Sequence, residues 1–101
     1  MNAKLAEFQQ LISLTQAMLE QAQSSSWDDV IKLEATRRSM ISAFFLTPVL
    51  PELTSTVSEG IRLIMAMDQD IMALGQAERH DAEQVLRQMD QGKKAVKAYS
   101  S

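Results

Sequence analysis

The sequence predicts an all-α fold, an antiparallel helical bundle of three long helices in which the third is the longest. Residues that favour strands are sparse, and the chain has only three glycines and two prolines to interrupt helices. Apolar residues also recur at intervals of three and four along most of the chain, the spacing of helices that pack on one side. At 101 residues, the chain (1–101) is expected to form a single domain.

The first helix is predicted from about Asn2, which can act as N-cap, to about Gln23. Its apolar stripe at positions 5, 8, 12, 15, 19 and 22 is widened on one side by Leu11, Leu14 and Met18. This helix is therefore expected to contact two neighbours. The serines at 24–26 form a short turn, and a link this short makes consecutive helices antiparallel.

The second helix is predicted to begin at Trp27. Ser25 or Ser26 can act as N-cap by accepting a hydrogen bond from a free backbone N–H, and the two aspartates that follow Trp27 suit the positive end of the helix dipole. The helix is expected to end near Leu46 or Thr47, because proline at 48 disfavours helical geometry at the residue before it.

The third helix is predicted to have Pro51 in its first turn and to continue to Gln91, where Gly92 would end it. That is about 40 residues or roughly 60 Å, against roughly 30 Å for each of the other helices, so half of it would lack a partner. A break at Gly75 is the alternative, with a shorter third helix and a fourth helix over about 81–98. The continuous or merely kinked helix is preferred, because the apolar spacing runs through Gly75 without a change of phase.

Three residues of the second helix are predicted to be structural: Trp27, Glu34 and Arg37. Trp27 is expected to close the end of the bundle, with its indole N–H on a backbone acceptor or water. Glu34 precedes Arg37 by three residues and Arg38 by four, so both are within ion-pair reach. The preferred interpretation is that Glu34 and Arg37 form an exposed ion pair. The alternative is that this pair is partly buried against Asp68 of the third helix and fixes the helix register.

Charge and composition argue against several classes of function. The net charge is −3, so direct nucleic-acid binding is disfavoured, and the lysines at 93, 94 and 97 are interpreted as complementing a helix end, with docking as the alternative. The chain has no cysteine, no signal-peptide-like start and no apolar run that would span a membrane, so a cytoplasmic protein is expected. The lone histidine, His80, is interpreted as a solvated helix residue; neither enzyme activity nor a cofactor, metal or catalytic site is predicted.

The third helix carries more apolar residues than one contact face can hold. Seven methionines are present, and Met65, Met67 and Met72 lie on this helix among isoleucines and leucines. One interpretation is that the helix is embedded between the other two, with methionine filling gaps in the core. The other adds a groove for an apolar helix of another chain. The candidate contacts for such a partner are Phe45, Met65, Met67, Met72 and Leu74.

The opening of the second helix resembles that of FliT-type flagellar export chaperones. In that family the pattern W-x-x-L-x-x-L-E-x-x-R-x-x-L-I opens this helix, and the matching positions here are Trp27, Val30, Leu33, Glu34, Arg37, Met40 and Ile41. The long first helix without charge clusters, the proline-containing link, the third helix and the ending at 92–99 are similar as well, so the likeness covers nearly the whole chain.

The resemblance implies a chaperone of flagellar type III export that binds the C-terminal region of the filament cap protein FliD before export. It also implies contacts with the export ATPase complex or with the flagellar master regulator FlhD/FlhC. Longer relatives have a fourth helix that covers the binding surface, and this chain is short there. Two alternatives remain: a regulatory adaptor that uses the same surface on a transcription regulator, and a self-associating bundle whose unpaired third helix forms a homodimer.

Overall fold

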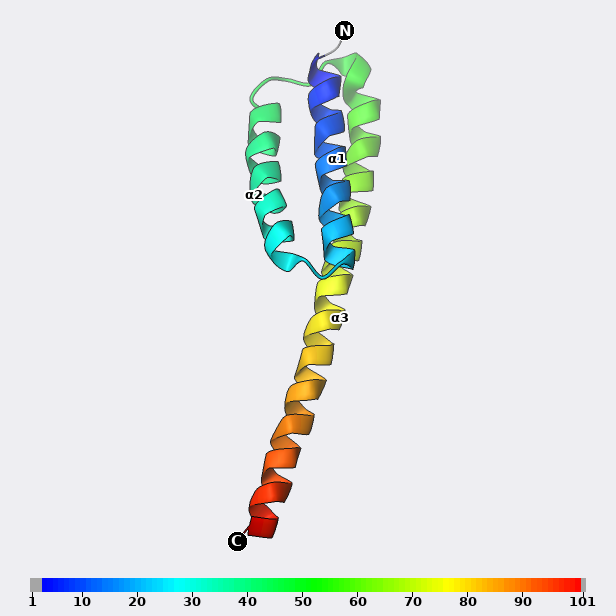
Figure 1. Ribbon diagram of the computed structural model, residues 1–101. Coiled ribbons are helices and arrows are strands. Elements are labelled where there is room, and N and C mark those ends of the chain that lie inside the picture. Colours follow the sequence, from blue (N-terminus) through cyan, green and yellow to red (C-terminus); the bar gives the residue numbers. More distant parts are fainter. Residues whose placement is uncertain (1–2, 101) are drawn as a thin grey trace.

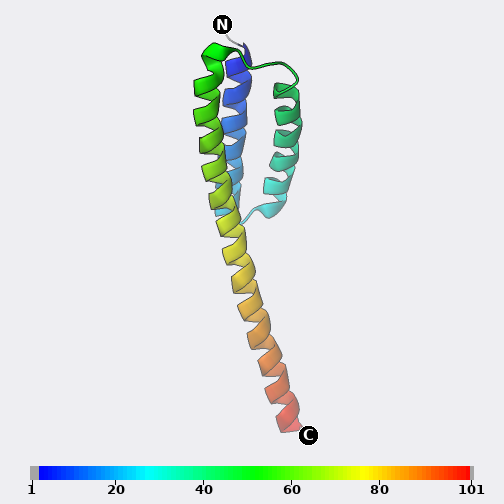
Figure 2. The ribbon, with the colours of Figure 1, turned by 180° about the vertical axis from the view of Figure 1, so that it is seen from behind.

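The computed structural model describes residues 3–100 and is built from helices alone over that range. They are α1 (Ala3–Gln23), α2 (Trp27–Phe44), the short 3-10 helix η1 (Pro51–Leu53) and α3 (Thr54–Ser100). α1 and α2 form an antiparallel hairpin that lies on the first half of α3 (Figures 1 and 2). The predicted all-α bundle with the longest helix third is confirmed.

α1 is the central helix of the bundle. It packs against both α2 and α3, as the width of its apolar stripe predicts, and its buried residues are Phe8, Leu11, Thr15, Met18 and Ala22. The interpretation that the third helix is embedded between the other two is therefore wrong. α2 and α3 both pack on α1 and make few contacts with each other.

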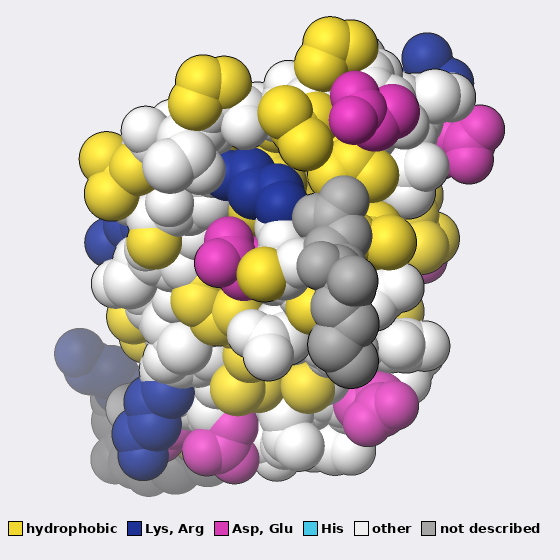
Figure 3. All heavy atoms as spheres, turned by 90° about the horizontal axis from the view of Figure 1, so that it is seen from above, with side chains coloured by type: hydrophobic (Ala, Val, Ile, Leu, Met, Phe, Trp, Pro, Cys, Tyr) yellow, Lys and Arg dark blue, Asp and Glu magenta, His cyan; other side chains and the backbone are white. Residues whose placement is uncertain are grey.

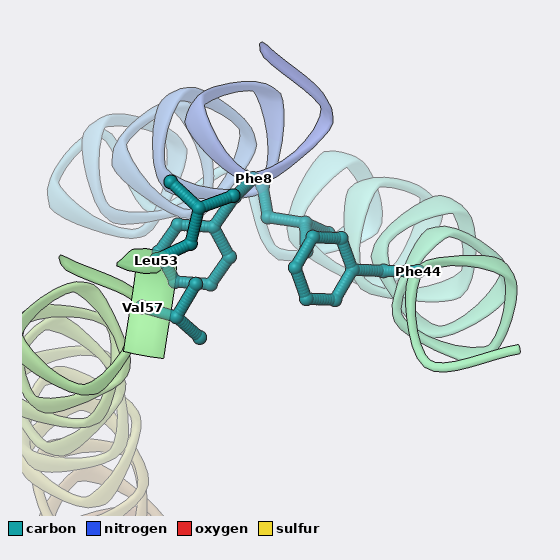
Figure 4. Packing of buried hydrophobic residues seen from close by; sticks show 5 residues of the cluster. Phe8, Phe44, Leu53 and Val57 are labelled. Atoms are coloured by element: carbon teal, nitrogen blue, oxygen red, sulfur yellow. The ribbon is translucent and has the colours of Figure 1, made fainter. Parts of the chain in front are cut away.

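The core consists of two clusters along α1. At the end near the N-terminus, Phe8 lies among Phe44 of α2, Leu53 of η1 and Val57 of α3 (Figure 4), and its ring centroid is 5.4 Å from that of Phe44. At the other end, Met18 and Ala22 pack with Val30 of α2 and Ile71 of α3. Each cluster joins all three helices, which makes the hairpin and the first half of α3 one packed unit.

The turn between α1 and α2 is closed by backbone groups. Ser25 has a φ of 59° and reverses the chain, while the Ser26 N–H donates to the Gln21 carbonyl at 2.9 Å. Ser26 occupies the predicted N-cap position, but its side chain makes no capping hydrogen bond, so that part of the prediction is wrong. The predicted N-cap of the first helix, Asn2, lies outside the described residues.

α2 ends at Phe44, two to three residues before the predicted end. Lys4 of α1 reaches over this end: its Nζ donates to the Phe44 carbonyl and to the Thr47 carbonyl and Oγ1, the last two at 3.1 and 2.7 Å. The same ammonium lies 4.0 Å from the centroid of the Phe44 ring. A cation here satisfies free carbonyls and complements the negative end of the helix dipole.

α3 is continuous through Gly75, as preferred above, and it also continues through Gly92. The predicted termination at Gly92 is wrong, and the described residues contain no separate fourth helix. A glycine costs a helix only about 1 kcal/mol, and flanking helix formers offset it, including Lys94, whose Nζ lies 3.3 Å from Asp90 one turn earlier. The second half of α3 extends beyond the hairpin, giving a molecule 75 Å long and 20 Å across (Figure 1). Among the described helices, none is long and apolar enough to cross a bilayer.

Candidate partner-binding groove

A groove runs between α2 and α3, where these antiparallel helices flank α1. An open pocket of about 670 Å³ lies there, lined from α2 by Trp27 and Ile31 and from α3 by Met72, Gly75, Arg79 and their neighbours. We call this pocket, together with the surface between α2 and α3 that leads from it toward the α2–η1 link, the α2–α3 groove.

Exposed apolar side chains line both walls of the α2–α3 groove. On α3, Ile61, Met65 and Met72 share one flank, since they are four and seven residues apart, and Met65 and Met72 are 56% and 62% exposed. On the α2 side, Ile31 lies one turn after Trp27, and Phe45 directly follows the last residue of α2. The exposed Glu34–Arg38 pair lies between them on this flank. Ile31 is 65% exposed although it is a large aliphatic residue. The apolar flank of α3 therefore faces a side of α2 that carries one exposed apolar residue, Ile31, next to the pocket.

An ion pair bridges the floor of the groove. Arg37 of α2 donates through Nη1 to Asp68 Oδ1 of α3 at 2.7 Å and to Thr15 Oγ1 of α1 at 3.2 Å. Thr15 is fully buried and its hydroxyl donates to the Leu11 carbonyl at 2.9 Å, so this polar network ties together all three helices.

The expected Glu34–Arg37 pair is absent from the described contacts. Glu34 pairs instead with Arg38, four residues later, on the exposed surface. Arg37 is only 13% exposed and points inward, because it lies on the flank of α2 that faces α1 and α3. The alternative prediction, a link to Asp68, describes Arg37 correctly, but Glu34 is not part of it.

Trp27 closes the far end of the groove. Its indole ring rests on Gly75, where an added Cβ would lie 3.5 Å from the ring, and its Nε1 donates to Glu78 Oε2. The expected acceptor was a backbone carbonyl or water, and the observed one is a carboxylate of α3. A side chain supplies the acceptor because α3 continues past the end of the hairpin.

The five predicted partner contacts have different environments. Phe45, Met65 and Met72 are exposed on the α2–α3 groove, whereas Met67 is 8% exposed and lies in the core. Leu74 is half-buried and packs with the core cluster on the other flank of α3, beside Leu19. Ile31 and Ile61 belong to the groove walls but were missed; their spacing from Trp27 and Met65 is the signal that would have identified them.

Further apolar side chains lie at the end of the bundle beside the α2–η1 link. Phe45, Leu46 and Leu50 are all exposed there, and hydrophobic side chains are spread over this end of the molecule (Figure 3). Phe45 makes an edge-to-face contact with the buried Phe44, at 5.0 Å between ring centroids. The apolar surface of the groove therefore continues onto this end of the bundle.

The described residues contain no cluster of side chains that is suited to a metal ion. Within residues 3–100, no three His, Cys, Asp or Glu side chains come together in a way that would hold one. His80 is exposed on the second half of α3, as predicted for a solvated helix residue. What the groove can do is bind a partner by burying the exposed apolar side chains that line it.

Comparison with known proteins agrees with the resemblance noted from the sequence. The family model described as flagellar protein FliT matches residues 5–101. No curated protein and no solved structure matches the chain. The matched range includes the hairpin, the link and all of α3. This chain therefore belongs to the FliT family of flagellar chaperones.

Proposed function

We propose that this chain is a flagellar export chaperone whose α2–α3 groove binds an apolar helical segment in the C-terminal region of the filament cap protein FliD. The observation that carries the proposal is the set of exposed apolar side chains beside the pocket between α2 and α3: Ile31 of α2, Phe45 just after it, and Ile61, Met65 and Met72 of α3. Single exposed apolar residues are common on protein surfaces, but several gathered on both sides of one pocket indicate a binding surface.

The groove suits a helix as its occupant. Two antiparallel helices with α1 beneath them form a channel in which a third helix can lay its apolar face. Burial of apolar area would supply the affinity, at about 25 cal/mol per Å² before ordering costs. Methionine side chains are flexible and polarizable, so Met65 and Met72 can adapt to the side chains of the segment.

The function would be sequestration. A segment whose apolar face lies in the groove cannot pair with its partners in the assembled filament cap. Release at the export apparatus would then require only that the segment be withdrawn from a shallow, open groove. The Arg37–Asp68 pair would hold α2 and α3 at a fixed separation while the groove is empty.

Titration calorimetry with a C-terminal fragment of the cognate cap protein tests this proposal. The parent chain is expected to bind, and the variant with Met65→Asp and Met72→Asp is expected to lose at least tenfold in affinity, since a carboxylate in an apolar contact costs more than about 1.4 kcal/mol. Leu63→Asp is the matched control, because Leu63 is exposed on the opposite flank of α3 and should leave binding unchanged. Absence of binding by the parent at about 50 μM, a free energy near −6 kcal/mol, would contradict the proposal.

Components of the export ATPase complex and the flagellar master regulator are proposed to contact the same groove. The cap fragment would then compete with them, because Met65 and Met72 cannot be covered twice. Adding saturating fragment before a regulator titration is expected to abolish regulator binding. A ternary complex would assign the regulator to a different surface.

A further inference from the structure

The methionines of α1 and α3 have sharply different access to solvent. Met18 and Met67 are buried in the core, whereas Met65 and Met72 are more than half exposed on the α3 wall of the α2–α3 groove. Met89 is exposed as well, but it lies on the second half of α3, away from the groove. The groove therefore presents two thioether sulfurs to the solvent while the core withholds its own.

Exposed thioethers are readily oxidised. The chain has no cysteine, so no thiolate competes with them for an oxidant. With hydrogen peroxide, a lone pair of the methionine sulfur attacks one peroxide oxygen, the O–O bond breaks, and water is the second product. The methionine sulfoxide that forms carries a polar S=O group where the thioether was apolar.

We propose that Met65 and Met72 form a redox-sensitive modification site, and that their oxidation by a peroxide prevents the α2–α3 groove from binding its apolar partner. This role rests on the proposed function, because it concerns binding in the same groove. Two sulfoxides would stand among the apolar contacts of the α3 wall, and burying a polar group without a hydrogen-bond partner is costly. Oxidation is therefore expected to release an apolar helix from the groove.

The pocket beside Trp27 offers hydrogen-bond donors to the oxidised form of Met72. Gln76 lies one turn after Met72 and Arg79 lies almost one turn further, and all three line this pocket. The Gln76 amide and the Arg79 guanidinium carry N–H groups that can donate to a sulfoxide oxygen. Such a contact would stabilise the sulfoxide in the free chaperone and make the pocket polar where an apolar partner would lie.

The fold should survive oxidation of the groove. Met65 and Met72 are exposed in the free chain, so their sulfoxides face water and displace no core contact. Met18 and Met67 are shielded by close packing. The modification is also reversible, because methionine sulfoxide reductases restore the thioether: two thiols of the reductant become a disulfide and the oxygen leaves as water. Oxidation of the groove is thus expected to change binding and to leave stability intact.

Peptide mass spectrometry after timed exposure to hydrogen peroxide tests the site without any partner. The two groove methionines are expected to gain an oxygen atom at least about tenfold faster than the buried Met18 and Met67. Met89 is the internal reference for an exposed methionine, and helix content by circular dichroism should stay constant. Oxidation of Met67 as fast as that of Met65, or loss of helix as the groove is oxidised, would overturn the proposal.

Calorimetric titration with the cap-protein fragment tests the effect on binding. Only the chaperone is treated, and the peroxide is removed before the titration. The parent is expected to lose at least about tenfold in affinity on oxidation and to regain it after treatment with the two reductases, one for each sulfoxide epimer. The variant with Met65→Leu and Met72→Leu should have the same affinity before and after peroxide. The ratio of the two affinities is the measured quantity, so any effect of leucine itself cancels.

Met89→Leu is the matched control, since it removes an exposed methionine outside the groove and should lose affinity on oxidation as the parent does. Binding by the parent that peroxide does not weaken would overturn the proposal and leave the proposed function standing. An equal loss in the parent and in the double leucine variant would also overturn it, because the effect would then arise elsewhere. Absence of binding by the untreated parent would contradict the proposed function and with it the effect on binding, while the oxidation rates test the site by themselves.

Discussion

The two halves of α3 have the same apolar spacing and different environments. In the first half, Val57, Met67 and Ile71 are buried against α1, whereas in the second half Val85, Leu86 and Met89 are more than half exposed. The difference lies in the reach of the hairpin: α1 has 21 residues, about 30 Å, and α3 has 47, about 70 Å. The spacing of apolar residues shows which face of α3 is apolar along its whole length. The length of α1 and α2 decides how much of that face is buried within one chain.

Deletion of a core ring gives the largest expected difference between the halves. Phe44→Ala should destabilise the chain by about 3–5 kcal/mol, because Phe44 is 1% exposed and packs on Phe8. Leu86→Ala in the second half should change stability by less than about 0.5 kcal/mol in the monomer. Urea unfolding at low protein concentration measures both. Equal losses for the two variants would show that the second half is packed in the monomer.

Removal of the Arg37–Asp68 ion pair is expected to give the next largest loss of stability. Arg37→Met keeps most of the volume of the side chain but leaves the Asp68 carboxylate without its cation, so a loss of about 2 kcal/mol is expected. Urea unfolding at neutral pH checks the value. If Asp68→Asn combined with Arg37→Met restores stability, the loss comes from the unpaired charge; if it does not, packing of the arginine stem is responsible.

Replacing a glycine by alanine should change the stability of the chain in opposite directions in the two halves of α3. A Cβ at Gly60 would overlap the Phe8 ring, so Gly60→Ala forces the core apart and is expected to cost about 1 kcal/mol even after the gain in helix propensity. Gly92 has no atom within 4 Å of an added Cβ, so Gly92→Ala should raise helix content and stability slightly. Thermal melts followed by circular dichroism compare them. A stabilising Gly60→Ala would contradict the close approach of α1 and α3.

The smallest expected effect is at Arg38. Its pair with Glu34 is exposed, so Arg38→Ala should change stability by only a few tenths of a kcal/mol. The same unfolding measurement checks this, with Arg37→Met for comparison. A loss as large as that of Arg37→Met would mean that the two arginines have exchanged roles in solution.

Local rules predicted most of the fold. The proline at 48 placed the break after α2, the serine turn placed the hairpin, and the unbroken spacing through Gly75 favoured one long third helix; all of these depend on neighbours in sequence. The end of α2 at Phe44 was missed because it depends on Lys4, forty residues away. The continuation of α3 through Gly92 was missed because the prediction considered the glycine alone. The residues that flank Gly92 favour a helix and offset its cost.

The site was harder to predict than the fold. The methionine excess left two interpretations of α3 open, a core helix and a helix that also binds a partner. The position of α1 decides which flank of α3 is buried, and that position depends on contacts between residues far apart in the sequence. Met67 and Leu74 were therefore placed in the groove although they face α1, while Met65 and Met72 lie on its open flank. The hydrogen bond from Trp27 to Glu78 was likewise missed, whereas the contact of Arg37 with Asp68 was predicted as an alternative.

Hydrogen exchange in the presence of the cap-protein fragment tests the central claim most directly, since it asks which half of α3 receives the partner. We expect slower exchange in peptides that cover residues 27–45 of α2 and 61–76 of α3, the two walls of the groove, and unchanged exchange across residues 82–97. Protection confined to residues 82–97, with the groove walls unchanged, would contradict the assignment of the groove as the binding site.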